Sequence, residues 1–236
     1  MENVQSILDE LKKMGSEQTR KTLMRHGAPE NIFGVKVGDM KTIVKRVKKN
    51  YELAKGLFDT GIGDAQYLAG LIGDEKKMTR KELEHWAKTS SWSMISEYAV
   101  PFVAAESAYA WELGLHWIQS KDPSIASCGW CTLIGFISIT PNEKLDVKAL
   151  EKLLHQIATG IHKAPNRVRY AMNNFIITTG GYVSTLHALA LETARKVGEV
   201  YVDMEGTACK VPDAASYIQK MVERGSLQKK KKTARC

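Results

Sequence analysis

Apolar residues recur at helical spacing through almost the whole chain, and this pattern limits the fold more than any other feature. Leucine, isoleucine and valine return at i, i+3, i+4 and i+7, so each segment presents one apolar face. Segments with this pattern begin at Val4, Met40, Leu53, Tyr67, Trp111, Val147 and Leu186. The period of two that marks a strand is almost absent, and residues 199–211 are the single strand candidate. The periodicity therefore predicts an all-α protein.

Capping residues and short connections divide the chain into about a dozen helices. TRKE (79–82) is a capping box, since the Thr79 hydroxyl and the Glu82 carboxylate can each bind a free backbone N–H. DP (122–123) predicts another start, TPNE (140–143) and APN (164–166) two more, and GG (180–181) a break. Short loops favour antiparallel helix pairs in series. The prediction is an α-α solenoid of degenerate HEAT-like units, with a compact irregular bundle as the alternative.

Positive charge is concentrated at the C-terminal end. Of the formal net charge of +8, five positive charges lie in QKKKKTARC (228–236), which contains no acid. We therefore expect one helical-repeat domain over residues 1–224 and a basic, disordered tail over residues 225–236. A basic chain is a candidate for binding polyanions, because neutralised phosphates release condensed counterions. The alternative is that the lysines only keep the chain soluble.

Composition and missing motifs exclude several function classes. No apolar run approaches the ~20 residues of a membrane span, and the acidic N-terminal segment lacks the apolar core of a secretory signal. We therefore expect a cytoplasmic protein. It is expected to be a monomer, although the sequence leaves the oligomeric state open. Glycine-rich nucleotide loops, HExxH and GxSxG are absent from the sequence, and the six histidines form no ligand-spaced pair. No metal or cofactor is expected.

The CGWC stretch places Cys128 and Cys131 at a spacing that fits a metal site, a redox pair or core packing. No second CxxC accompanies them, and the flanking residues form an apolar helical run. We favour two structural thiols one turn apart on a buried helix. The role of Cys209 stays open, while Cys236 is expected to be free and exposed.

Three segments, in this order, resemble a known protein family. They are NIFGVKVGDMKTIVKRV (31–47), LAKGLFDTGIGDAQYLAGLI (53–72) and WAKTSSWSMISEYAVP (86–101). Together they are similar to the DNA-alkylation-repair family of HEAT-like-repeat DNA glycosylases. The resemblance covers residues 1 to about 200 and implies a C-shaped superhelix whose basic concave face holds duplex DNA. It also implies hydrolysis of the glycosidic bond of N3- or N7-alkylated purines without full extrusion of the base.

The family's chemistry explains the residue types in its site. An alkylated purine is already a cationic leaving group, so the enzyme mainly stabilises positive charge with tryptophan faces and a carboxylate. Trp92 corresponds to the first site tryptophan, although a tryptophan at a helix start commonly packs in the core. Ser96 stands where the resemblance places the catalytic aspartate. The next residue, Glu97, lies about 100° further round a helix and is the candidate catalytic replacement.

Two further positions differ from the family pattern. The site arginine falls in IASCGWCTL (125–133), which contains no arginine. The second site tryptophan falls on Asn173 or Asn174. Three of the four key positions are therefore altered, which leaves the glycosylase reaction open.

The remaining candidates are residues that could hold DNA. Asn166, Arg169 and Asn173 follow i, i+3, i+7 spacing, which places two amides and a guanidinium on one helix face. The other candidate DNA contacts are Arg167, which lies beside this face, and a basic stripe formed by Lys41, Lys45 and Lys48. Either stripe can instead be a solvated helix face.

These observations support three hypotheses. The first is a DNA-binding member of the family whose N-alkylpurine glycosylase activity is weak, altered or lost. The second is an active glycosylase that uses Glu97 with Trp92. The third is a non-catalytic HEAT-like scaffold for protein or nucleic-acid partners. Convergence of Trp92, Arg169, Asn173 and the lysine stripe on one concavity favours DNA, whereas an apolar or acidic concave face favours the scaffold.

Overall fold

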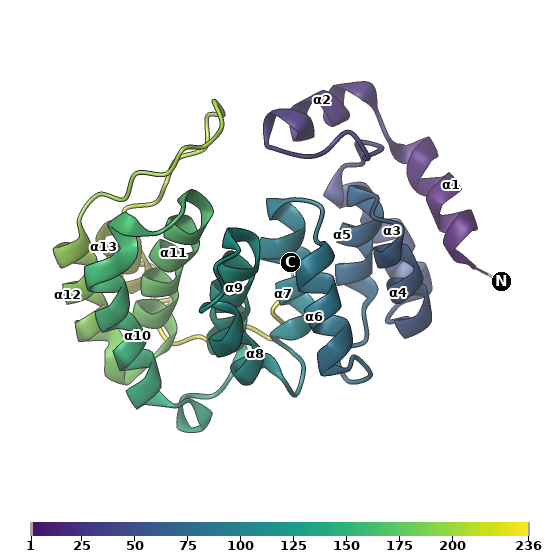
Figure 1. Ribbon diagram of the computed structural model, residues 1–236. Helices are drawn as coiled ribbons and strands as arrows, with labels where there is room; N and C mark the ends of the chain where they lie inside the picture. The colour runs from purple at the N-terminus through teal and green to yellow at the C-terminus, as the bar shows by residue number, and fades with distance from the viewer. Residues whose placement is uncertain (1, 236) are drawn as a thin grey trace.

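The computed structural model describes residues 2–235, in which the regular elements are all helical and no strand is present (Figure 1). The helices are α1 (Val4–Met14), α2 (Glu17–Arg25), α3 (Val37–Val47), α4 (Tyr51–Asp59), α5 (Gly63–Ile72), α6 (Arg80–Thr89), α7 (Val100–Ala104), α8 (Ala110–Trp117), α9 (Pro123–Ile139), α10 (Val147–Gly160), α11 (Asn166–Tyr182), α12 (His187–Val197) and α13 (Ala214–Glu223). A π-helical turn, η1 (Ile95–Ala99), precedes α7, and the 3-10 turns are η2 (Asn142–Lys144), η3 (Ile161–Lys163) and η4 (Ser184–Leu186). The all-α prediction is confirmed. Among residues 2–235, no helix is both long and apolar enough to cross a membrane.

Successive helices pack side by side and follow an arc. α4 packs on α5, α8 on α9, and α11 on both α9 and α12. Figure 1 shows the arc running from α1 to α12, with α2 and the segment between α12 and α13 approaching each other across its open side. Short connections leave each helix beside its neighbour in sequence, which is the stacked arrangement that the sequence predicts.

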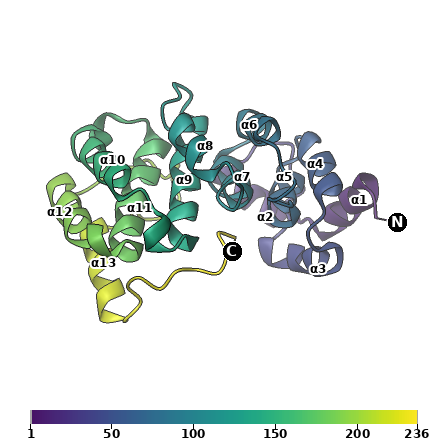
Figure 2. The same ribbon diagram turned by 90° about the horizontal axis from the view of Figure 1, so that it is seen from below.

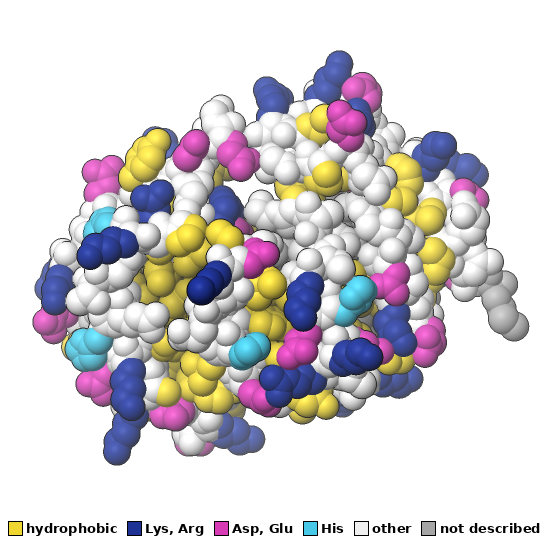
Figure 3. Space-filling view, viewed as in Figure 1, with side chains coloured by type: hydrophobic (Ala, Val, Ile, Leu, Met, Phe, Trp, Pro, Cys, Tyr) yellow, Lys and Arg dark blue, Asp and Glu magenta, His cyan; other side chains and the backbone are white. Residues whose placement is uncertain are grey.

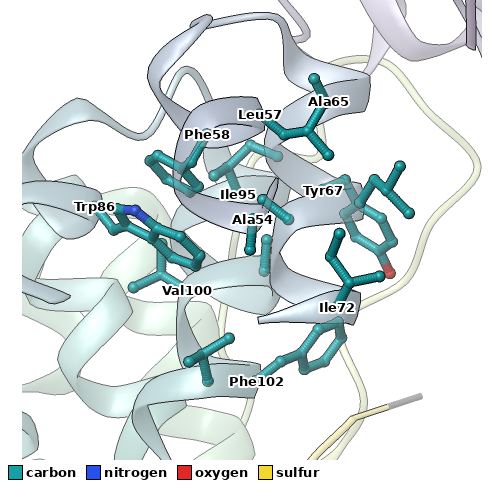
Figure 4. Close-up of a cluster of buried hydrophobic side chains, with 14 of the residues drawn as sticks. Ala54, Leu57, Phe58, Ala65, Tyr67, Ile72, Trp86, Ile95, Val100 and Phe102 are labelled. Atoms are coloured by element: carbon teal, nitrogen blue, oxygen red, sulfur yellow. The ribbon is translucent and has the colours of Figure 1, made fainter. Parts of the chain in front are cut away.

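Two hydrophobic cores lie along the arc and meet at α9. The N-terminal core draws its buried residues from positions 7 to 128, and the C-terminal core from positions 118 to 218. α9 supplies Cys128 to the first core and Trp130 to the second. Figure 4 shows part of the N-terminal core, where the rings of Phe58 and Trp86 stack with centroids 4.2 Å apart. Each large side chain buried in this way stabilises the fold by about 1.5–3 kcal/mol.

The helix starts agree with the capping signals, with one correction. Thr79 and Glu82 form the capping box of α6, and Asp122 caps α9 through the backbone N–H groups of its first turn. The TPNE signal was wrong as the start of a long helix, because only the 3-10 turn η2 forms there. The start of α10 is six residues later than the proline of that signal, and its cap is Asp146.

The two glycines at 180 and 181 lie within α11 and do not break it. A Cβ on Gly180 would lie 2.6 Å from Cδ1 of Ile218, so the absent side chain makes room for α13. The helix continues to Tyr182. These glycines therefore serve the packing of two helices, which a pattern read along one segment does not reveal.

The strand candidate at residues 199–211 was wrong, because the segment is an extended excursion without a ladder. Its tip is a turn in which Glu205 and Gly206 both have positive φ, 56° and 70°, and Thr207 N–H donates to the Met204 carbonyl at 3.0 Å. These are the features of a type I′ turn. The segment is held by side chains of α11 and not by a partner strand.

The last residues form an extended strap, defined here as residues 226–235, where the sequence predicts a disordered tail. Figure 2 shows the strap leaving α13 and crossing the molecule toward α7. Lys230 Nζ donates to the Ile137 carbonyl at 2.9 Å, and Arg235 pairs with the buried Glu75 carboxylate at 2.9 Å. The strap therefore joins the C-terminal helices to the loop after α5.

Candidate nucleic-acid interface

A π turn directs the side chains that follow Trp92. Pro101 has no N–H to donate, and its ring would clash with the carbonyl of Glu97 in a regular α-helix. The backbone instead forms the wider bond from Val100 N–H to the carbonyl of Ile95. Single π turns inside helices are frequent at functional sites. Here the turn sets the directions of residues 96–98, so regular helical spacing does not give them.

Glu97 and Arg167 form a buried ion pair between η1 and α11. Arg167 Nε donates to Glu97 Oε1 at 2.8 Å, and Nη2 donates to the second carboxylate oxygen. The Glu97 side chain is 2% exposed and that of Arg167 is 27% exposed. Burial raises the pKa of the Glu97 carboxyl and the guanidinium opposes this shift, while the hydrogen bonds to Glu97 raise the pKa of Arg167. The two candidate site residues therefore neutralise each other.

Two cavities lie on either side of this pair. The larger, which we call the tyrosine cavity, has a volume of about 850 Å³. The smaller, which we call the tryptophan cavity, has a volume of about 340 Å³. Tyr98 and Tyr170 line both, and the Arg167 guanidinium lies 4.9 Å from the centre of the Tyr170 ring. The ion pair and these two rings form the partition between the cavities.

Aromatic and basic side chains surround the tyrosine cavity. It lies against η1, α7, α9, α11 and α13, and the strap closes one side. Its aromatic and charged lining consists of Tyr98, Phe102, Tyr170, Tyr182, Tyr217, Lys210, Lys220, Arg224, Lys231 and Glu97. Glu97 is the one acid in this lining, and its charge is compensated by Arg167. The cavity is therefore electropositive.

The tryptophan cavity contains the position matched to the family's tryptophan, but its carboxylate is a different residue from the one expected. Trp92 packs partly against the N-terminal core and also lines the cavity, so the core packing is observed and the role in binding stays a prediction. Ser96 is buried, and its hydroxyl donates to the Ser93 carbonyl at 3.4 Å. Glu97 does not line this cavity, whereas Glu205 does. Glu205 was not predicted from the sequence, although the Glu205–Gly206 pair of the type I′ turn is a local signal for an exposed turn.

The amide stripe of α11 holds the excursion between α12 and α13. Asn166 accepts from the backbone N–H of Asp203 and donates to its carbonyl, both at 2.8 Å. Asn173 is buried and donates to the Pro212 carbonyl at 2.8 Å. Arg169, the third member, donates to Asn166 at 3.4 Å. None of the three lines either cavity, since their shared face is covered by residues far along the chain.

Asn174, the other candidate for the second tryptophan position, lines the tyrosine cavity. Lys41, Lys45 and Lys48 are exposed on or just after α3, make no ion pair within residues 2–235 and line neither cavity. Figure 2 shows α3 and α13 on the same side of the molecule as the strap.

The expected convergence of all candidate residues on one concavity is not observed. Trp92 and Arg167 share one cavity, and Glu97 and Asn174 share the other.

The face of the molecule opposite the strap has a charge pattern that differs from that of the tyrosine cavity. Figure 3 shows that lysine and arginine side chains are interspersed with acids over α6, α8 and α10. Arg80, for example, pairs with both Glu84 and Glu112 on this face. Mixed surface pairs of this kind are typical of a solvated surface and produce no extended field of one sign.

The CGWC thiols lie where the structural interpretation places them, on α9. Cys128 is buried in the N-terminal core, and Cys131 lines the tyrosine cavity. Burial raises the pKa of both thiols, so they stay protonated and are poor nucleophiles at neutral pH. Cys209 is exposed and lines the tryptophan cavity, while Cys236 lies outside the described residues.

The fold agrees with that of known proteins whose sequences and structures are similar to this chain. The family model described as DNA alkylation repair enzyme matches residues 7–218. Uncharacterized proteins of Listeria monocytogenes and Listeria innocua are 36% and 35% identical over 217 residues, which is 89% of this chain and 93% of each relative. A solved structure with a TM-score of 0.92 and 34% identity covers 100% of both chains. It is described as a new family of proteins related to the HEAT-like repeat DNA glycosylases with affinity for branched DNA structures. The HEAT-like fold prediction is confirmed.

Proposed function

The chain belongs to the DNA alkylation repair enzyme family, and we propose that it is a DNA-binding member that prefers branched DNA and does not excise alkylated bases. The preference is proposed because the solved protein that it resembles over its full length is described as having affinity for branched DNA structures. The electropositive tyrosine cavity supports DNA over an acidic or apolar scaffold surface.

The absence of base excision rests on one observation, the Glu97–Arg167 pair. Excision of a cationic base needs a carboxylate that faces the lesion and its sugar. Ser96, at the matched position, has no carboxylate, and Glu97 is buried and bonded through both oxygens to Arg167. A carboxylate neutralised in this way contributes little stabilisation to a second cation. This argues against catalysis by Glu97.

The binding proposal is tested by titrating a four-way junction and a linear duplex of the same total length with the purified protein. We expect tighter binding of the junction, and affinity for both DNAs that falls as salt is raised from about 50 to about 200 mM, because phosphate contacts release counterions. If neither DNA is bound at the lower salt concentration, the DNA-binding proposal is wrong.

The excision proposal is tested with DNA that contains N7-methylguanine. We expect no release of methylguanine above the rate without protein. Release would contradict the proposal and favour a second candidate, an active glycosylase, for which Glu205 beside Trp92 is the specific observation. Glu97→Gln and Glu205→Gln then distinguish the two carboxylates, because only the variant of the participating residue loses the release.

A further inference from the structure

We propose that the tyrosine cavity holds an unpaired nucleotide of the bound DNA. The inference rests on the proposed DNA binding and specifies which part of a branched DNA the protein recognises. The ligand is an aromatic ring joined to an anionic backbone, and the cavity offers a partner for each part.

The first argument is the exposure of two tyrosine rings at the cavity. Tyr98 on η1 is 40% exposed and Tyr217 on α13 is 48% exposed, whereas large aromatic side chains such as Trp86 and Phe175 are fully buried. Tyr98 is oriented by an edge contact with Phe102, with ring centroids 6.3 Å apart. A tyrosine ring stacks on any base, because every base has a π face. The two rings therefore provide surfaces for stacking that do not depend on base identity.

The second argument is charge. Lys210, Lys220 and Arg224 line the cavity beside the tyrosines, and Lys231 of the strap lines its remaining side. None of the four makes an ion pair within residues 2–235. Their charges are available for phosphate groups, which lysine and arginine bind in nucleic-acid sites without reading the sequence.

The third argument is size. The cavity volume of about 850 Å³ lies within the range of about 300–1,000 Å³ that is usual for small-molecule sites. A base within a duplex cannot use the tyrosine rings, because its faces are covered by its neighbours in the stack and extrusion costs a few kcal/mol. Unpaired nucleotides at bulges and branch points avoid most of this cost. The cavity is therefore suited to such positions and not to a continuous duplex.

The test compares two DNAs that differ by one nucleotide, a fully paired duplex and the same duplex with a single unpaired 2-aminopurine. We expect the wild-type protein to bind the bulged DNA about tenfold more tightly, as stacking of one base allows, and to change the fluorescence of the 2-aminopurine. Tyr98→Ala and Tyr217→Ala should each remove most of this preference. Tyr217→Phe, which keeps the ring, should retain it.

Tyr201→Ala is the matched control, because Tyr201 is 72% exposed and lines neither cavity. It should behave like the wild type. Equal binding of bulged and paired DNA by the wild type overturns the inference and leaves the proposed DNA binding intact, as does full retention of the preference in both alanine variants. Absence of binding to any DNA overturns the proposed function as well. Free dAMP is titrated in parallel, and affinity for dAMP equal to that for the bulged DNA would overturn the assignment to DNA.

Discussion

Removal of Arg167 tests whether the Glu97 carboxylate is held charged in a buried position. Arg167 donates a hydrogen bond to each carboxylate oxygen of Glu97, and the Glu97 side chain is 2% exposed. In Arg167→Ala the carboxyl loses this partner and stays buried. Leaving one charge of a buried pair without its partner typically costs about 3–5 kcal/mol.

Protonation of the Glu97 carboxyl limits the loss of stability in Arg167→Ala at neutral pH. Holding a glutamic acid with an ordinary pKa of 4.5 protonated at pH 7 costs about 3.4 kcal/mol, at about 1.36 kcal/mol per pH unit. We therefore expect Arg167→Ala to lower the free energy of unfolding by about 3 kcal/mol at pH 7. Without the guanidinium, burial raises the pKa of Glu97 further. The penalty is thus absent below pH 4.5, grows as the pH rises, and amounts to about 0.7 kcal/mol at pH 5 by the same reasoning.

Urea unfolding followed by circular dichroism at pH 7 and pH 5 measures both values. Arg169→Ala is a control on the same helix, since Arg169 makes no ion pair within residues 2–235 and its removal should cost less than about 1 kcal/mol at either pH. The double variant Glu97→Gln/Arg167→Ala removes both charges, so its loss should not change between pH 5 and pH 7. A single variant as stable as the wild type at pH 7, or equally destabilised at both pH values, would refute the reasoning.

Three further expectations follow from local geometry. Burial alone would raise the pKa of Glu82, but its hydrogen bonds lower it to about 2. Glu82→Gln should therefore lose about 1–2 kcal/mol at pH 7, a difference that shrinks as the pH falls from 4.5 toward 2 in urea unfolding. Burial lowers the pKa of Lys230 from 10.5 to about 8, so docking of the strap strengthens as the pH rises from about 8 toward 10.5. Trypsin cleavage after Lys232, relative to the free peptide, should therefore be slower at pH 9 than at pH 7. Gly180→Ala should cost about 1–3 kcal/mol in thermal unfolding because α13 must move, whereas Gly160→Ala, with nothing within 4 Å of the new Cβ, should not destabilise.

The features that were predictable from the sequence are those set by bonds between neighbours in the chain. The capping box of α6 closes within three residues, and the cap of α9 within two or three. The same reasoning could have found the π turn, because Pro101 lacks the backbone N–H that a regular helix uses as a donor at that position. Reasoning from neighbours in the chain placed the start of α10 too early, because TPNE also suits a 3-10 turn. Whether a helix or a 3-10 turn forms at TPNE depends on where the following helix packs.

The candidate site was less predictable because its residues meet across long sequence separations. Glu97 and Arg167 are 70 residues apart, and no spacing rule links a π turn to the first turn of α11. Asn166 and Asn173 were correctly placed on one face of a helix. Their partners, Asp203 and Pro212, lie 37 and 39 residues further along, in and just after the segment that was the strand candidate. Periodicity identifies a polar face but not what covers it.

If the Glu97–Arg167 pair takes the place of a free carboxylate, as the proposed function holds, it also changes which ligand suits the site. A cationic alkylated base is attracted by an uncompensated carboxylate, and it would be repelled by the basic lining of the tyrosine cavity, where Glu97 is already neutralised. On the proposal made above, a neutral unpaired base would avoid that repulsion, stack on Tyr98 and Tyr217, and bring a phosphate that the basic side chains attract. The same pair joins the two hydrophobic cores near their common helix. The Glu97–Arg167 pair and the basic lining thus favour recognition of DNA structure over recognition of a charged lesion. The predicted loss of stability in Arg167→Ala and the proposed binding of an unpaired base are therefore linked. Disruption of the pair should weaken both the fold and the selectivity for neutral bases.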